Sequence, residues 1–218
     1  MQLKKEGVTV RKREVKAVLF DLDGTLVDSY TAWFHIVNDT LKSVGLNQLK
    51  EAEFSKGFGT PVEKDAKNLY RGMMPKGEII KKYNHYFKKR KHHVRLFRQT
   101  VPVLKKLSKS KIKLALITNS SRSIANDVLK HHNLRKYFKA VIAMDDVSRS
   151  KPAPDMVFKA CKKLKVKIND IILVGDSKND MLAGKNAGCV TVGYRMKGDY
   201  RISKLNDIQK IIKIVFNE

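Results

Sequence analysis

Acidic and small polar residues follow three apolar segments of this sequence, at positions where they could act together on one ligand. These residues are Asp21 and Asp23 after AVLF (17–20), Thr118, Asn119 and Ser120 after LALI (114–117), and Gly175 and Asp176 after IILV (171–174). If the apolar segments are parallel strands, their carboxyl ends meet at one edge of a sheet, which is where ligands bind in open α/β folds. We therefore expect these side chains to converge.

The convergent set has the composition of a site for phosphoryl chemistry. Lys151, in the loop after AVIAM (140–144), would add an ammonium to the carboxylates. Because carboxylates alone repel a phosphate dianion, the set calls for Mg²⁺, a hard cation that binds oxygen ligands. One Asp could then attack phosphorus, while Thr118 and Lys151 hold the other phosphoryl oxygens. The second Asp would give a proton to the leaving group and later take one from water.

Short strands must alternate with helices to place these residues. The apolar runs at 17–20, 113–118, 140–144, 170–176 and 190–194 predict buried strands. Helical patterns are predicted at 100–110, 121–133, 154–165, 179–188 and 202–218. This alternation predicts an α/β fold with a doubly wound parallel sheet, a Rossmann-like core covered by helices on both faces.

Residues 29–93 break the alternation and predict a second, helical domain inserted after the first strand. Helical patterns run through 29–46, 61–73 and 77–93, and no strand pattern occurs there. We predict a catalytic core of residues 1–28 and 94–218 and a helical cap of residues 29–93. At the start of the chain, the alternation in 7–15 favours an extra edge strand over a loose basic arm.

Four motifs, in this order, resemble the haloacid dehalogenase-like (HAD) superfamily. They are DLDGT (21–25), TNS (118–120), the lysine of KPAPD (151–155) and GDSKND (175–180). The resemblance covers about residues 15–195, and the helical insertion is similar to the branch that includes phosphoglycolate phosphatases and β-phosphoglucomutase. It implies a mobile cap whose closure excludes water and selects the substrate.

The resemblance also implies roles for individual residues. Asp21 matches the nucleophile that becomes a phospho-aspartate, and Asp23 matches the general acid/base. Thr118 matches the phosphate-binding hydroxyl, and Lys151 matches the lysine that bridges nucleophile and phosphate. The predicted phosphate-binding set is Gly24, Thr118, Asn119 and Lys151.

A magnesium site is implied by the same resemblance. Asp176 matches a metal ligand, and Asp180 matches a residue that supports the metal shell or binds the ion through water. Asp21 completes the set with its carboxylate, and Asp23 with its backbone carbonyl. The predicted cofactor is therefore Mg²⁺, held by Asp21, Asp23, Asp176 and Asp180.

Asp23 favours a phosphomonoester as substrate, because a leaving alcohol needs a proton and a leaving halide does not. We predict a Mg²⁺-dependent phosphatase for a small phosphorylated metabolite, similar to phosphoglycolate phosphatase. A sugar-phosphate mutase similar to β-phosphoglucomutase is the alternative enzyme, since both aspartates occur there too. A third hypothesis is a basic protein that mainly binds nucleic acid or another polyanion.

Charge and composition limit the partners and the location that the sequence allows. The 218 residues carry 46 Lys+Arg against 21 Asp+Glu, a net charge of +25. The lysines are spread along polar helical faces, which favours a solvated basic surface over a nucleic-acid partner, and either arrangement attracts anionic substrates. No apolar run is long enough for a membrane span, and no secretory signal is recognised. The two cysteines, Cys161 and Cys189, predict buried thiols and a cytoplasmic protein. The oligomeric state is not predicted.

Overall fold

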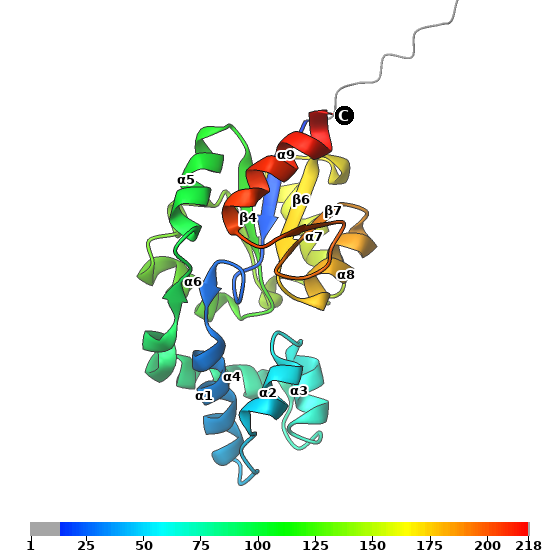
Figure 1. Cartoon of the computed structure of the whole chain (residues 1–218). Helices are drawn as coiled ribbons and strands as arrows, with labels where there is room; N and C mark the ends of the chain where they lie inside the picture. The colour runs from blue at the N-terminus through cyan, green and yellow to red at the C-terminus, as the bar shows by residue number, and fades with distance from the viewer. Residues whose placement is uncertain (1–13, 218) are drawn as a thin grey trace, which may run out of the picture.

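A six-stranded parallel sheet forms the centre of the protein. The computed structural model describes residues 14–217 (Figure 1). The order of the strands is β5-β4-β1-β6-β7-β8, and all neighbours pair in parallel. Their bounds are β1 Ala17–Phe20, β4 Lys113–Ile117, β5 Ala140–Ile142, β6 Ile171–Gly175, β7 Val190–Tyr194 and β8 Tyr200–Ile202. The first five correspond to the strands predicted from the apolar runs, although β5 ends at Ile142, earlier than expected.

The central strand β1 carries the first motif to the middle of the sheet edge. Its last residue, Phe20, pairs with Leu116 of β4 on one side and with Val174 of β6 on the other. All four residues of β1 are buried, because both faces of the sheet are covered. The chain therefore leaves the sheet at Asp21, between the ends of β4 and β6.

Helices cover both faces of the sheet, so the predicted doubly wound fold is confirmed. In Figure 1, α5 and α9 lie on the side turned to the viewer, and α7 and α8 pack against each other on the other side. The helices of this part are α5 Thr100–Lys109, α6 Arg122–His131, α7 Asp155–Leu164, α8 Lys178–Ala187 and α9 Ile208–Asn217. In the described part of the chain, none of the helices is both long and apolar enough to cross a membrane.

The end of the chain differs from the expectation of a helix beginning at Ile202. Tyr200–Ile202 instead forms the edge strand β8 beside β7, and a short 3-10 helix, Leu205–Asp207, precedes α9. Backbone pairing with β7 decides the conformation here, since only Ile202 of the three β8 residues is buried. The strand predicted over 7–15 falls largely outside the described residues.

Four helices fill most of the segment between the antiparallel strands β2 (Val27–Asp28) and β3 (Arg95–Leu96). We call them the cap helices: α1 Tyr30–Lys42, α2 Glu51–Gly57, α3 Val62–Asn68 and α4 Lys76–Arg90. A 3-10 helix, Lys91–His93, leads from α4 to β3. The cap helices lie beyond the carboxyl ends of the sheet strands (Figure 1). Helix α2 has no counterpart among the predicted helices, because Phe54 is its only buried residue and leaves little periodicity.

Candidate active site

A buried ion pair between Asp21 and Lys151 lies at the centre of the sheet edge. Asp21 and Lys151 are 5% and 2% exposed. The Lys151 ammonium donates to Asp21 Oδ1 at 2.5 Å and to the Ile117 carbonyl at 3.2 Å. No described residue donates a hydrogen bond to the other carboxylate oxygen of Asp21. Asp21 therefore has one oxygen that is held and one that is free to react.

Asp180 holds Lys151 from the opposite side. Its Oδ1 accepts from the Lys151 ammonium at 2.6 Å, and its Oδ2 accepts from the Ser177 hydroxyl at 2.5 Å and the Ser177 amide at 3.1 Å. Ser177 and Asp180 form the capping box of α8, in which each side chain bonds the backbone amide of the other. Asp180 thus caps its helix and also fixes the ammonium, so both of its oxygens are already engaged by the protein.

Both oxygens of the Asp23 carboxylate accept hydrogen bonds. Its Oδ1 accepts from Ser29 Oγ at 2.6 Å and from Trp33 Nε1 at 3.1 Å. Its Oδ2 accepts from Ser120 Oγ at 2.7 Å, and the Thr118 hydroxyl lies 3.5 Å away. These donors come from the start of the cap and from the end of β4. The orientation of Asp23 is therefore set jointly by core and cap.

Asn119 ties the end of β4 to the loop that carries the lysine. Its side-chain amide donates to the Lys151 carbonyl, and its Oδ1 accepts from the Lys151 amide, both at 3.0 Å. The Thr118 hydroxyl accepts from the Ser120 amide at 3.0 Å. Asn119 thus positions Lys151 with both ends of its side chain, and its predicted contact with phosphate stays a prediction.

Three carboxylates are close enough to share a cation. Oxygen atoms of Asp21, Asp176 and Asp180 all lie within 4.8 Å of one another, and Thr25 Oγ1 donates to Asp176 Oδ1 at 2.6 Å. Gly24 makes room for them: its φ is +83°, and a Cβ there would lie 2.1 Å from an Asp176 oxygen. An all-oxygen set of this kind fits a hard cation such as Mg²⁺. The side chain of Asp23 is not part of this cluster.

Burial makes Asp21 and Asp176 hard to ionise without a cation. The pKa of Asp176 is raised to about 7, because desolvation and next the neighbouring Asp180 raise it more than the hydrogen bond from Thr25 and the charge of Lys151 lower it. Desolvation also raises the pKa of Asp21 well above its ordinary value, and Lys151 opposes this. For Lys151, the two acids outweigh burial and raise its pKa. A divalent cation between Asp21 and Asp176 would favour their ionised forms.

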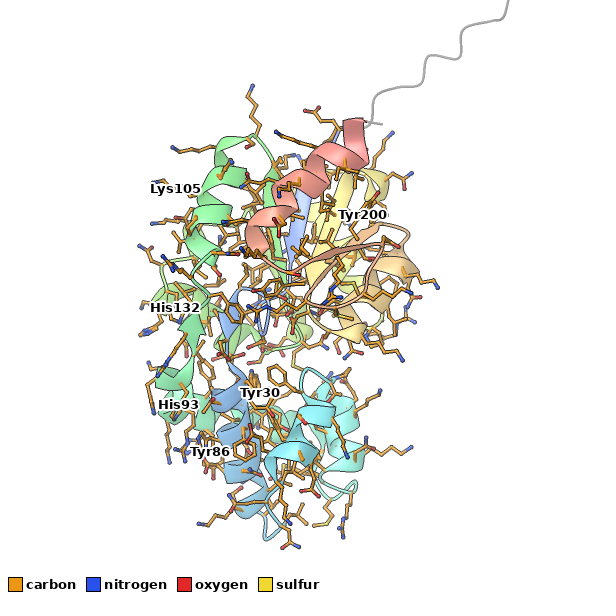
Figure 2. All side chains as sticks on the ribbon, viewed as in Figure 1. Tyr30, Tyr86, His93, Lys105, His132 and Tyr200 are labelled. Carbon is orange, nitrogen blue, oxygen red and sulfur yellow. The ribbon has the colours of Figure 1, made fainter. Side chains whose placement is uncertain are left out.

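A cavity of about 570 Å³ joins these residues to the cap helices. On the core side it is lined by Asp21, Asp23, Thr118, Asn119, Lys151 and Asp176. On the cap side, Tyr30 and Trp33 of α1 and residues of α2, α3 and α4 line it. In Figure 2, Tyr30 lies where the cap meets the core. The cap helices thus form the second wall of the site.

The structure brings the sequence-predicted residues to one place and adds others. Ser29 and Trp33 are not among the residues predicted from the sequence, although they contact Asp23 directly. Their signal in the sequence is weak, because one is a serine before a helix and the other fits the apolar face of an amphipathic helix. Ser120 belongs to the TNS motif, and its hydroxyl donates to Asp23, a contact that the motif alone does not predict.

Comparisons with known proteins agree with this geometry. The family model for haloacid dehalogenase-like hydrolases matches residues 18–194. A relative named pyrophosphatase PpaX, from Anoxybacillus flavithermus, is 29% identical over 92% of this chain and 98% of its own length. A phosphoglycolate phosphatase from Neisseria meningitidis is 32% identical over 82% of this chain and 80% of its own length. The crystal structure of a hydrolase from Pseudomonas syringae shares the fold with a TM-score of 0.79, at 23% identity, and covers 91% of this chain and 98% of its own.

The chain belongs to the haloacid dehalogenase-like hydrolases, and the resemblance drawn from the four motifs is confirmed. It is an enzyme of that family.

Proposed function

We propose that this enzyme is a Mg²⁺-dependent phosphatase that hydrolyses a small phosphomonoester through a phospho-Asp21 intermediate. The observation that carries the proposal is that two aspartates at the sheet edge have different hydrogen-bond partners. Asp21 has a free oxygen beside the Lys151 ammonium, whereas both oxygens of Asp23 accept hydrogen bonds from the core and the cap. One is placed to attack phosphorus, and the other is placed to transfer a proton.

In the first step, the free carboxylate oxygen of Asp21 attacks phosphorus and the bond to the leaving oxygen breaks. Lys151 and the Thr118 hydroxyl line the same cavity and can hold phosphoryl oxygens. Asp23 gives its proton to the leaving alcohol. In the second step, Asp23 takes a proton from water as the water attacks phosphorus. The bond between phosphorus and the Asp21 oxygen breaks, inorganic phosphate leaves, and Asp21 is restored as a carboxylate.

Asp21 and Asp176 would hold the Mg²⁺, with the Asp23 carbonyl as a further predicted ligand and Asp180 outside direct contact. Bound there, the ion would offset the charge of the carboxylates and of the phosphoryl group. Asp180 is placed differently, since Lys151 and Ser177 already occupy both of its oxygens. Its proposed role is to position Lys151 and the end of β6.

In this proposal, the cap excludes water from the site and selects the substrate. Residues 29–93 would form a cap domain, and residues 1–28 with 94–218 would form the catalytic core. The cap helices close one side of the cavity and supply Trp33 to Asp23. The free, buried Cys161 and Cys189 are consistent with a reducing compartment, so we place the enzyme in the cytoplasm.

Two alternatives remain distinguishable from hydrolysis. A sugar-phosphate mutase would return the phosphoryl group to a second substrate hydroxyl, whereas a phosphatase passes it to water. The structure weakens the argument for polyanion binding that rests on the basic segment 88–98. Its aromatic residue, Phe97, packs against Tyr194, and Arg195 lies beside both rings. Phe97 is therefore not free to stack on a base. We therefore retain hydrolysis as the function.

The test is phosphate release from a panel of phosphomonoesters, with and without Mg²⁺, by the whole chain and by Asp21→Asn. We expect release that requires Mg²⁺ and that falls by at least a thousandfold in the variant. The panel includes phosphoglycolate, and pyrophosphate, which is an anhydride and not a monoester, is assayed beside it, after the names of the relatives. Absence of release from every compound by folded protein with Mg²⁺ would refute the proposal, and transfer to a sugar phosphate would favour the mutase.

A further inference from the structure

The size of the cavity bears on what the leaving group can be. At about 570 Å³ it lies within the range of roughly 300–1,000 Å³ in which proteins bury drug-sized ligands. The phosphoryl site occupies only the end at Asp21 and Lys151. Glycolate or a second phosphate would leave most of the remaining space, toward the cap helices, to water.

The cap is docked on the core in this structure, so the cavity is not a gap left by an open cap. On one side, the Asn179 side chain of α8 donates to the Gly59 carbonyl of the cap at 3.0 Å. On another, the Ser121 hydroxyl at the start of α6 donates to Asn84 Oδ1 of α4 at 2.5 Å. The volume is therefore what remains when core and cap are hydrogen-bonded to each other.

Aromatic rings form the cap side of this volume. We call Tyr30, Trp33, Phe54 and Phe58 the aromatic wall. The Tyr30 ring packs edge-on against Phe54 and Phe58, with 5.2 Å between centroids in each pair. Phe54 is buried, whereas Tyr30, Trp33 and Phe58 keep part of their surface exposed although they line a cavity. Such partly covered rings are suited to a flat, apolar ligand surface.

The charged groups of the cap side argue against a second anionic group deep in the cavity. Asp65 lines it from α3 and accepts from Thr60 Oγ1 at 3.0 Å and Tyr83 OH at 2.9 Å. The basic residues of the lining on the cap side, Lys56 and Lys64, are exposed. They can attract an incoming phosphate, but they do not reach a buried position in this structure.

We propose that the leaving group is an uncharged alcohol carrying a planar ring, seated against the aromatic wall. This inference rests on the proposed phosphatase function and narrows its substrate class. It separates this enzyme from the activities in the names of its relatives, since neither glycolate nor phosphate has a ring and both are anionic.

The experiment compares phosphate release from benzyl phosphate, propyl phosphate, 4-carboxybenzyl phosphate, phosphoglycolate and pyrophosphate at saturating Mg²⁺. Benzyl phosphate and propyl phosphate both release a simple alcohol. The ratio of their kcat/KM values therefore measures the contribution of the ring. The carboxybenzyl compound adds only a negative charge to the ring. We expect kcat/KM for benzyl phosphate to exceed that for each of the other four by about tenfold or more, the gain that one or two good ring contacts supply.

Variants connect this preference to the aromatic wall. Phe58→Leu should lower kcat/KM for benzyl phosphate at least threefold more than for propyl phosphate, because it removes a ring and keeps an apolar side chain. Tyr137→Leu is the matched control, since Tyr137 lies on a 3-10 helix of the core and does not line the cavity; it should leave the ratio unchanged.

The outcomes separate this inference from the proposed function. Mg²⁺-dependent release that is fastest for phosphoglycolate or pyrophosphate, or equal for benzyl and propyl phosphate, would overturn the ring-bearing substrate and leave the phosphatase intact. Absence of release from any compound would overturn both. Should Phe58→Leu fail to fold, the ratios measured on the unchanged protein still decide the question.

Discussion

At the scale of single residues, the site depends on carboxylates that are close together but engaged by different donors. Asp21, Asp176 and Asp180 share one small volume. Lys151 bridges Asp21 and Asp180, whereas Thr25 donates to Asp176 and Ser177 donates to Asp180. Removing the Thr25 or Ser177 hydroxyl therefore perturbs one carboxylate more than the others, and removing the Lys151 ammonium perturbs two. Substitutions in this set can assign separate roles.

Trp33 offers such a substitution for Asp23. Trp33→Phe removes the indole N–H that donates to Asp23 and keeps an aromatic ring beside Tyr83. Because the loss of one such hydrogen bond is worth about 1 kcal/mol, kcat should fall about fivefold. Because Asp23 protonates the leaving alcohol in the proposed mechanism, the loss should be larger for an alkyl phosphate than for 4-nitrophenyl phosphate, whose leaving group needs no proton.

Ser29→Ala is the comparison for Trp33→Phe, since Ser29 donates to the same oxygen, Asp23 Oδ1. It should lower kcat with the same dependence on the leaving group. An equal loss of kcat for both substrates in either variant would show that these residues act through packing and not through Asp23. Steady-state kinetics with the alkyl phosphate and with 4-nitrophenyl phosphate would distinguish the two.

At the scale of elements, a buried hydrogen-bond network holds the cap together. Asp65 at the start of α3 accepts from Thr60 before it and from Tyr83 of α4, and Tyr70 OH donates to Tyr83 OH at 3.2 Å. Burial raises the pKa of Asp65 to about 6, although the hydrogen bonds from Tyr83 and Thr60 lower it. The cap therefore contains an acid that is easier to protonate in the folded state than in the unfolded state.

This pKa predicts a pH dependence of stability. A raised carboxyl pKa contributes stability that is complete below pH of about 4 and is lost as pH rises to about 6, up to about 3 kcal/mol. Asp65→Asn cannot titrate. The free energy of unfolding of the unchanged protein, minus that of Asp65→Asn, should thus fall between these pH values and stay level above them. Urea unfolding at each pH measures it.

Glu51→Gln, at an exposed acid of the cap, is the control and should show no such trend. A difference between the unchanged protein and Asp65→Asn that rises with pH, or does not change, would mean that Asp65 is ionised as easily in the fold as in the unfolded chain.

The elements also show how far sequence reasoning reaches. Strands such as β1 and β6 are predictable because both faces of the sheet are covered and their residues are continuously apolar. Strand β8 has one buried residue in three and depends on pairing with β7, so its short sequence gives no local signal. The positions of Asp21, Thr118 and Asp176 follow from strand ends. The donors to Asp23 depend on how the cap packs, which no spacing in the sequence specifies.

At the scale of the whole molecule, the excess of positive charge is unevenly distributed. The chain carries a net charge of +25, and no acidic residue occurs between Glu78 and Asp127. That stretch runs from α4 through β3 and α5 to α6, and its residues His93 and Lys105 lie along one side of the molecule in Figure 2. The resulting field should draw anionic substrates toward the protein.

This field predicts a salt dependence of the reaction with any anionic monoester. Raising the ionic strength from about 0.01 to 0.3 M shortens the screening length from roughly 30 Å to below 8 Å. We expect kcat/KM to fall three- to tenfold and kcat to change less than twofold. Lys56→Gln, at the cavity, should weaken the salt dependence more than Lys105→Gln, which lies away from it. A kcat/KM independent of salt would contradict steering.

The central claim, a covalent intermediate on Asp21, is tested most directly by trapping it. The enzyme is mixed with its best phosphomonoester and Mg²⁺, quenched during turnover and reduced with borohydride, which converts an acyl phosphate of Asp to homoserine. Mass spectrometry of the peptides then locates the modification. We predict homoserine at position 21, dependent on both substrate and Mg²⁺. Homoserine at another aspartate, or none during rapid turnover with phosphate release unaffected in Asp21→Asn, would contradict the account.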